Sequence, residues 1–274
     1  MASLSPAPEP GGEDAADRAL LLAAAEAAGE IARRQFGSEP DHWEKSEGAG
    51  PVSTVDLEID RMLRAELLSA RPDYGWLSEE SPESIADPAR RHAARTFIVD
   101  PLDGTRAYLK GEPGFCHALA VVEAGLVVAG VVHLPMHRQS YAAHRGGGAS
   151  LNDTPLVAGE PDGTPKILSS RYAMRPQHWP GGVPEARQSF RPALAHRLAL
   201  VAAGEAGATL TFRPAWEWDI AAGAIIAEEA GVRVTAADGH VPPFNGAEPR
   251  WPSLLVAPPA YHAALLARLA PSAG

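Results

Sequence analysis

The strongest constraint on the fold comes from one apolar segment in the middle of the chain, His117–Pro135, whose sequence is HALAVVEAGLVVAGVVHLP. Two runs rich in β-branched residues flank Glu123-Ala124-Gly125, a pattern typical of a β-hairpin. The following segment, RQSYAAHRGGGASLND, continues the strands, with one expected at Tyr141–His144 and a turn at the glycines. The chain therefore requires a sheet near its centre.

Two helices are predicted before this sheet. Residues Ala15–Phe36 are rich in alanine and leucine and almost free of helix breakers, which predicts a long helix opened by Asp14. A loop rich in glycine, serine and proline is expected from residue 37 to residue 51. A second helix is predicted from about Val55 to Ala70, because its apolar residues recur at helical spacing.

Strands and helices alternate over the rest of the chain. Short strands are expected near Tyr74–Leu77 and Phe97–Val99, joined by a proline-rich, charged connection. After the central strands we predict strands at 166–168, 209–213, 232–235 and 253–256, with helices at 194–203, 219–230 and 260–269. This order favours an α+β half followed by an α/β half. We expect a flexible tail at 1–14 and halves at 15–160 and 161–274.

Charge and cysteine content exclude several functional classes. The formal net charge of −10 argues against a nucleic-acid polymer or a membrane surface as partner, although a small phosphorylated ligand remains compatible. The single cysteine, Cys116, permits no intramolecular disulfide, and its apolar neighbours favour a buried, unreactive thiol. No apolar stretch is long enough to span a membrane, and the first residues lack the features of a signal peptide. We expect a cytoplasmic protein.

The hexapeptide DPLDGT, residues 100–105, is the first candidate for chemistry. Asp100 follows an apolar strand, where a carboxylate is costly to bury unless it is paired or bound to a metal. Pro101 stiffens the turn to Asp103, and Gly104 permits close approach of a ligand. Amides at the start of a helical turn from Thr105 would face an anion. Carboxylates beside phosphate-binding amides suit Mg²⁺, although the same residues are also ordinary turn formers.

Acidic residues at three more sites could likewise be metal ligands or ordinary structural carboxylates. Glu79 and its neighbour Glu80 follow a short strand. Asp219 precedes an apolar helix, where an N-cap is the ordinary role of an aspartate, and two tryptophans beside it favour a shielded pocket. Asp56 would lie in the first turn of the second helix, where the helix dipole alone would favour it. Individually these residues do not define a site.

Together, four segments resemble the successive motifs of the inositol monophosphatase family of Mg²⁺-dependent, lithium-sensitive phosphatases: GPVSTVD, WLSEES, VDPLDGT and WEWDIAAGAIIAEEAG. The resemblance extends from about residue 15 to the C-terminus. The family includes inositol monophosphatases, 3'(2'),5'-bisphosphate nucleotidases, fructose-1,6-bisphosphatases and histidinol phosphatases. Membership implies a layered αβαβα sandwich that is often a homodimer, with most metal ligands in the first half.

The resemblance also implies a role for each matching residue. Glu79, Asp100 and the carbonyl of Leu102 would bind one Mg²⁺, and Asp100, Asp103 and Asp219 would bind a second, with Glu79 near a weaker third. Thr105, hydrogen-bonded towards Asp56, would orient and help deprotonate the attacking water. The catalytic set is therefore Thr105, Asp56 and Glu79. The amides of Gly104 and Thr105 would bind the phosphate, and Asp219 would also contact the substrate.

Departures from the family pattern concern the substrate. Ser78 replaces a common glycine before Glu79, and QSFRPALAH, residues 188–196, replaces a small, serine-rich segment. Arg213 stands near a position where inositol-specific members carry a glutamate, and an arginine suits a second phosphate. Arg213 and Arg191 could equally be solvated. They favour 3'-phosphoadenosine 5'-phosphate over inositol monophosphate; histidinol phosphate and sugar phosphates are the alternatives.

Two other functional classes fit the sequence less well. A catalytically inactive, metal-binding regulatory relative would be expected to lack a ligand or the threonine, and here every matching residue is present. A zinc hydrolase is disfavoured because the histidines, including His117, His133, His137 and His144, lack the spacing of metal ligands.

Overall fold

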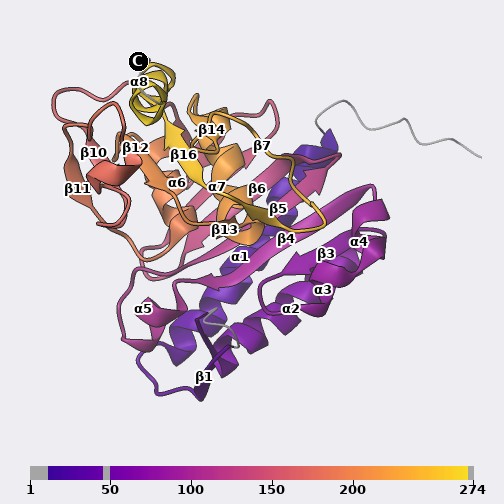
Figure 1. The fold of residues 1–274 in the computed structure, drawn as a ribbon. Coiled ribbons are helices and arrows are strands. Elements are labelled where there is room, and N and C mark those ends of the chain that lie inside the picture. The colour runs from indigo at the N-terminus through magenta and orange to yellow at the C-terminus, as the bar shows by residue number, and fades with distance from the viewer. Residues whose placement is uncertain (1–11, 46–49, 271–274) are drawn as a thin grey trace, which may run out of the picture.

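The protein is built of five layers, shown in Figure 1 for a computed structural model that describes residues 12–45 and 50–270. Helices α1 (Gly12–Gln35) and α2 (Thr54–Ala70) cover one face of a seven-stranded sheet. Helices α6 (Leu194–Ala202) and α7 (Glu217–Glu229) separate this sheet from a five-stranded one, whose outer side carries α8 (Pro259–Leu269). The expected αβαβα sandwich is confirmed.

The other helices within residues 12–45 and 50–270 are short. They are α3 (Glu83–Ala86), α4 (Pro88–His92), α5 (Thr105–Leu109) and the 3-10 helix η2 (Pro176–His178). The strands are β1 (His42–Glu44), β2 (Pro51–Ser53), β3 (Gly75–Ser78), β4 (Arg95–Asp103), β5 (Cys116–Glu123), β6 (Leu126–Leu134), β7 (Gln139–His144), β8 (Ala149–Leu151), β9 (Thr154–Leu156), β10 (Lys166–Leu168), β11 (Arg187–Ser189), β12 (Ala208–Thr211), β13 (Ala215–Trp216), β14 (Arg233–Thr235), β15 (Arg250–Trp251) and β16 (Leu254–Ala257).

The predicted hairpin is β5 and β6, and it forms the middle of the large sheet. The strand order of that sheet is β3-β4-β5-β6-β7-β8-β9, with β3 and β4 parallel and every later pair antiparallel. Ala124 and Gly125 have φ values of 48° and 81° and make the two-residue turn, where positive φ matches the twist of the strands. Except for Leu126 beside the turn, the hairpin buries its apolar residues on both faces, against α1 on one side and α7 on the other.

Helix α7 is apolar on nearly its whole circumference because it lies between the two sheets. Its residues from Ile220 to Ala227 are all buried. Such a helix has no solvent-facing stripe, unlike α1 and α2, which cover an outer face. Apolar residues of the central sheet, α6, α7 and the second sheet form one contiguous core. The expected division between residues 160 and 161 falls in the connection between β9 and β10; it remains a prediction.

The structure corrects the predicted N-terminal region. The predicted loop from 37 to 51 contains β1, which pairs antiparallel with β2. Most of the expected tail lies outside the described residues, but Gly12, Glu13 and Asp14 belong to α1. Asp14 therefore does not open the helix. It is buried and bonds with Arg95 at 2.8 Å, an ion pair that ties α1 to β4 and that local sequence could not reveal.

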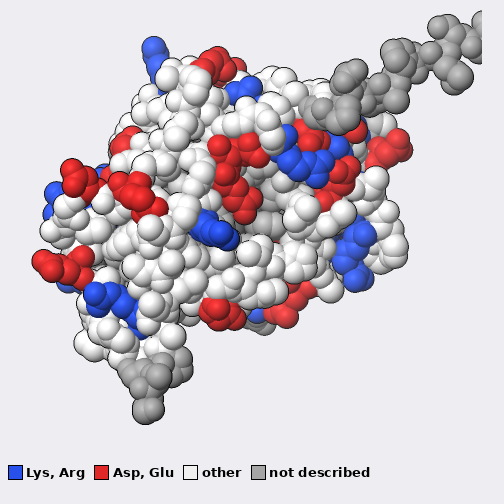
Figure 2. All heavy atoms as spheres, turned by 90° about the horizontal axis from the view of Figure 1, so that it is seen from above, with Lys and Arg blue, Asp and Glu red and all other residues white. Residues whose placement is uncertain are grey.

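Acidic and basic side chains are interspersed over the face shown in Figure 2, with no broad basic area on it. This distribution agrees with the net charge of −10 and gives that face no electrostatic attraction for a phosphate polymer. Within residues 12–45 and 50–270, no helix is long and apolar enough to cross a membrane.

Candidate metal centre

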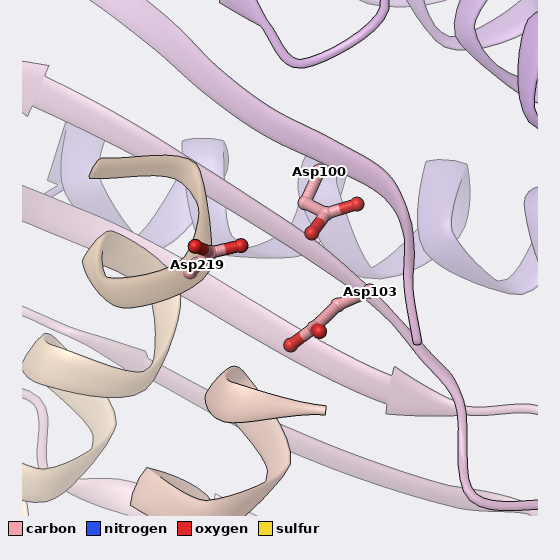
Figure 3. Close-up of side chains that lie close together, drawn as sticks. All are labelled: Asp100, Asp103 and Asp219. Atoms are coloured by element: carbon pink, nitrogen blue, oxygen red, sulfur yellow. The ribbon is translucent and has the colours of Figure 1, made fainter. Parts of the chain in front are cut away.

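Three aspartates from distant parts of the chain meet at one point of the fold. Asp100 and Asp103 come from β4 and Asp219 from α7, and one carboxylate oxygen of each lies within 4.8 Å of the others. Figure 3 shows the three side chains converging on a common space between the strand and the start of the helix. The structure thus brings together the two aspartates of the hexapeptide and the one beyond the tryptophans.

The end of β4 sets the directions of Asp100 and Asp103. We expected the strand to end at Val99, but it continues to Asp103, and its register with β5 shifts between Asp100 and Asp103. Within this bulge the Leu102 amide donates to Asp100 Oδ1 at 2.9 Å. A bulge re-aims side chains that a regular strand would point to alternate faces, and here it supports two carboxylates on one side.

Gly104 ends the strand and begins the predicted helical turn, which is α5. Its φ is 103°, a left-handed value that strains any residue with a Cβ atom. A Cβ there would also lie 3.2 Å from Phe115 Cα. Glycine therefore lets the backbone turn sharply, and the amides of Gly104 and Thr105 come to the first turn of α5 beside the aspartates.

Asp219 is not the N-cap of α7, because the helix begins two residues earlier at Glu217. Its carboxylate accepts from the Trp216 amide at 3.3 Å, as an acid in the first turn of a helix can. The rings of Trp216 and Trp218 stack with centroids 4.6 Å apart, and Asp219 is half-buried. The shielded pocket expected around Asp219 remains a prediction.

The electrostatics of the cluster favour a bound cation. Burial raises the pKa of Asp100 well above its usual range, and repulsion from Glu79 and Asp103 adds to it. Burial likewise raises the pKa of Asp103 to about 7 and that of Asp219 well above normal. Buried carboxylates of like charge are stable together when a bound cation compensates them. Hard oxygen donors in this number fit Mg²⁺.

Glu79 also lies at this site and forms an ion pair with Lys45. Lys45 Nζ lies 2.7 Å from Glu79 Oε1 and 2.8 Å from Glu80 Oε1. Burial alone would lower the pKa of Lys45, but the two glutamates outweigh it and the net shift is upward. Burial and repulsion by Glu79 raise the pKa of Glu80 to about 8. Sequence reasoning missed Lys45, because it follows β1 in the segment predicted as loop.

Thr105 and Asp56 form the predicted hydrogen bond. Thr105 Oγ1 lies 2.8 Å from Asp56 Oδ1 and 3.1 Å from the Leu102 carbonyl oxygen. Asp56 is held in turn by Ser53, the N-cap of α2, whose amide donates to Asp56 Oδ2 at 2.9 Å. Burial raises the pKa of Asp56, while hydrogen bonds from Ser53 and Thr105 oppose the rise. The first turn of α2 thus orients the threonine.

A cavity of about 580 Å³ opens above these groups. Of the site residues predicted from the sequence, the lining includes Glu79, Asp100, Leu102, Asp103, Gly104, Thr105 and Asp219. Asp56, which bonds to Thr105, and Arg213 are outside the lining. The basic residues in the lining are Arg106 of α5 and Lys110, which directly follows that helix. Arg213 and Arg191 are not in the lining. The Arg213 guanidinium lies 5.1 Å from the centre of the Tyr172 ring, and the side chain is exposed.

Histidine and cysteine do not contribute ligands to this cluster. His117 and His133 are buried, with ring centroids 6.1 Å apart, and burial lowers their pKa values to about 3 and about 4. Both are therefore neutral core residues, as the absence of ligand spacing suggested. Cys116 is buried and free, and burial raises its pKa well above normal.

A layered α/β fold that brings buried carboxylates and an anchored threonine to one cavity is typical of metal-dependent phosphoester hydrolases. Comparison with known proteins identifies the family. The model of the inositol monophosphatase family matches residues 15–273. The chain belongs to this family and is a phosphoric monoester hydrolase.

Relatives with several activities resemble the chain over most of its length. An inositol-1-monophosphatase of Rhizobium meliloti is 36% identical over 82% of this chain and 87% of its own. The 3'(2'),5'-bisphosphate nucleotidase CysQ of Salmonella typhimurium is 30% identical over 72% and 81%. The crystal structure of the extragenic suppressor protein SuhB from Bartonella henselae superposes with a TM-score of 0.79 at 27% identity, covering 93% of this chain and 98% of that one.

The raised pKa values predict a pH-dependent stability without metal. Burial raises the pKa of Asp103 to about 7 in the folded protein, whereas the unfolded chain keeps the ordinary value. The protonated carboxyl group therefore stabilises the folded protein at low pH, and this stabilisation is lost as pH rises through about 7. We expect the melting temperature of the magnesium-free protein to fall by about 5 °C between about pH 5.5 and pH 8. Magnesium should remove most of the fall, and Asp103→Asn should flatten it. A metal-free melting temperature that rises over this interval would contradict the explanation.

Proposed function

We propose that the protein is a Mg²⁺-dependent phosphomonoesterase that hydrolyses a small phosphorylated metabolite, either a 3'(2'),5'-bisphosphate nucleotide or an inositol monophosphate. The observation that carries this proposal is the convergence of Asp100, Asp103 and Asp219 within 4.8 Å beside the Thr105–Asp56 pair. Two to three ions would bind: Glu79, Asp100 and the Leu102 carbonyl would hold one, and the three aspartates another.

The bound metal would supply an acidified water and a charge that stabilises the leaving oxygen. The side chains of the protein position the attacking water. Thr105, by donating its hydroxyl hydrogen to Asp56, has its oxygen lone pairs free to accept from a water molecule in the cavity. Asp56 is a stronger base than an exposed aspartate because burial raises its pKa, so it can take up a proton through Thr105. Glu79 is a second carboxylate in reach of that space.

Substrate contacts follow from the cavity lining. The amides of Gly104 and Thr105 would bind the phosphate oxygens, with Asp219 opposite them. Arg213 is less well placed than the sequence suggested, because it lies outside the lining. Arg106 and Lys110 are exposed, line the cavity and would interact with a second anionic group. This arrangement supports a bisphosphate substrate.

A substrate panel tests the proposal. We expect Mg²⁺-dependent turnover of 3'-phosphoadenosine 5'-phosphate or inositol 1-phosphate at least tenfold above histidinol phosphate and fructose 1,6-bisphosphate. Chelation should abolish the activity, and lithium at millimolar order should inhibit it. The double variant Arg106→Ala/Lys110→Ala should lower kcat/KM about tenfold for the bisphosphate only, and Arg213→Ala should not. Turnover without added divalent metal, or none with any phosphomonoester, would refute the assignment.

A further inference from the structure

An exposed aromatic ring stands at the mouth of the cavity. Phe190 belongs to the segment 188–196 that departs from the family pattern, and it lines the cavity together with Pro192. Its side chain is 53% exposed, although burying a phenylalanine is ordinarily favourable. Core packing therefore does not explain the ring.

The ring is held in place from beneath by a buried arginine. Arg197 of α6 is only 9% exposed, and its guanidinium lies 4.4 Å from the centre of the Phe190 ring. The same guanidinium donates to the carbonyl of Arg191 at 2.6 Å and to that of Pro192 at 3.2 Å. One side chain thus supports the ring by a cation–π contact and fixes the backbone that carries it.

This segment is also tied to the metal centre. The amide of Ala195 donates to Asp103 Oδ2 at 2.8 Å, so the start of α6 and one aspartate are joined directly. Pro192 packs against Gly114, where an added Cβ would lie 3.1 Å from the proline ring. The position of Phe190 relative to the carboxylates is therefore set by three separate contacts. A ring fixed in this way is a preformed contact surface.

We propose that Phe190 determines specificity by stacking on a planar aromatic group of the leaving alcohol, so that the preferred substrate is a phosphomonoester of a nucleoside. This inference rests on the proposed phosphatase function and selects between its two substrate classes. Phe190 and Pro192 both line the cavity, and their side chains consist of carbon and hydrogen alone, which suits the face of a base. A polyol against the same two side chains would lose water and gain no hydrogen-bonding side chain.

Three phosphomonoesters separate stacking from general binding: adenosine 3'-phosphate, methyl ribofuranoside 3-phosphate, which lacks only the base, and inositol 1-phosphate. We expect Phe190→Leu, which retains apolar bulk without the ring, to lower kcat/KM for the adenosine ester about tenfold, a typical loss for one base–aromatic contact. The other two esters should change less than twofold. Phe190→Tyr should retain the wild-type preference. Leu126→Ala, at a 59% exposed apolar residue of the β5–β6 turn, is the matched control.

The experiment distinguishes failure of the Phe190 proposal from failure of the proposed phosphatase function. An equal loss for all three esters in Phe190→Leu, or a wild type that prefers inositol 1-phosphate, would overturn the role of Phe190 and leave the phosphatase function standing. A wild type that hydrolyses none of the three with Mg²⁺ would refute the phosphatase function. Calorimetry with adenosine alone, which needs no metal, then tests the stacking separately: its Kd should rise about tenfold in Phe190→Leu, and an unchanged Kd would overturn the inference.

Discussion

Replacing Asp100 by asparagine is expected to lower Mg²⁺-dependent phosphatase activity about a thousandfold, which corresponds to about 4 kcal/mol of lost transition-state stabilisation. Asp100 is buried, faces the two other aspartates and lies in both proposed ligand sets. An asparagine keeps the size and one oxygen but removes the charge that binds the cation. The activity should be measured over a magnesium titration, because a weakened site also shifts the midpoint to higher concentration.

The same substitution should stabilise the protein when no metal is present. Asp100 has its pKa raised by burial and by repulsion from Glu79 and Asp103, so a neutral side chain relieves a cost that the charged one carries above neutral pH. We expect a melting temperature several degrees higher in chelator at about pH 8. Asp153→Asn removes one charge from an 86% exposed side chain and is the matched control. Near-full activity of Asp100→Asn would show that Asp100 is not a metal ligand.

Elements with a strong local signal were predicted well from the sequence. The β5–β6 hairpin has mostly apolar runs with paired valines on both sides of a turn that adopts positive φ, so neighbouring residues alone indicate it. The helical turn after Gly104 likewise depends on residues a few positions apart. The convergence of the aspartates was expected only through the resemblance, since no local rule brings residue 219 to residue 100.

Features that depend on long-range contacts could not be predicted. Lys45 is part of the site because β1 and β2 bring it to Glu79, 34 positions away. Arg213 was placed near the substrate from its position along the chain, whereas its side chain lies over Tyr172. The N-cap role considered as the alternative for Asp219 does not hold, because α7 begins at Glu217, whose amide donates to the Pro249 carbonyl oxygen. Each difference comes from tertiary packing.

Replacing Thr105 by valine should lower kcat about a hundredfold while leaving magnesium affinity within about twofold, because the valine removes the hydroxyl and little volume. The hydroxyl joins Asp56, at 2.8 Å, to the cavity, and Asp56 is not in the cavity lining. Without it a water has no acceptor that connects it to the buried carboxylate. Thr105 is not among the proposed metal ligands, so metal binding should survive.

Thr105→Ser, which retains the hydroxyl, should recover most of the activity, and Asp56→Asn should resemble Thr105→Val because an amide is a poor proton acceptor. The double variant Thr105→Val/Asp56→Asn should be little worse than either single one, since both changes interrupt the same connection. Calorimetric magnesium titrations beside single-turnover rates separate the two effects. If Thr105→Val lost magnesium affinity in proportion to its rate, the hydroxyl would support the metal centre, and the positioning of water would have to come from another residue of the cavity.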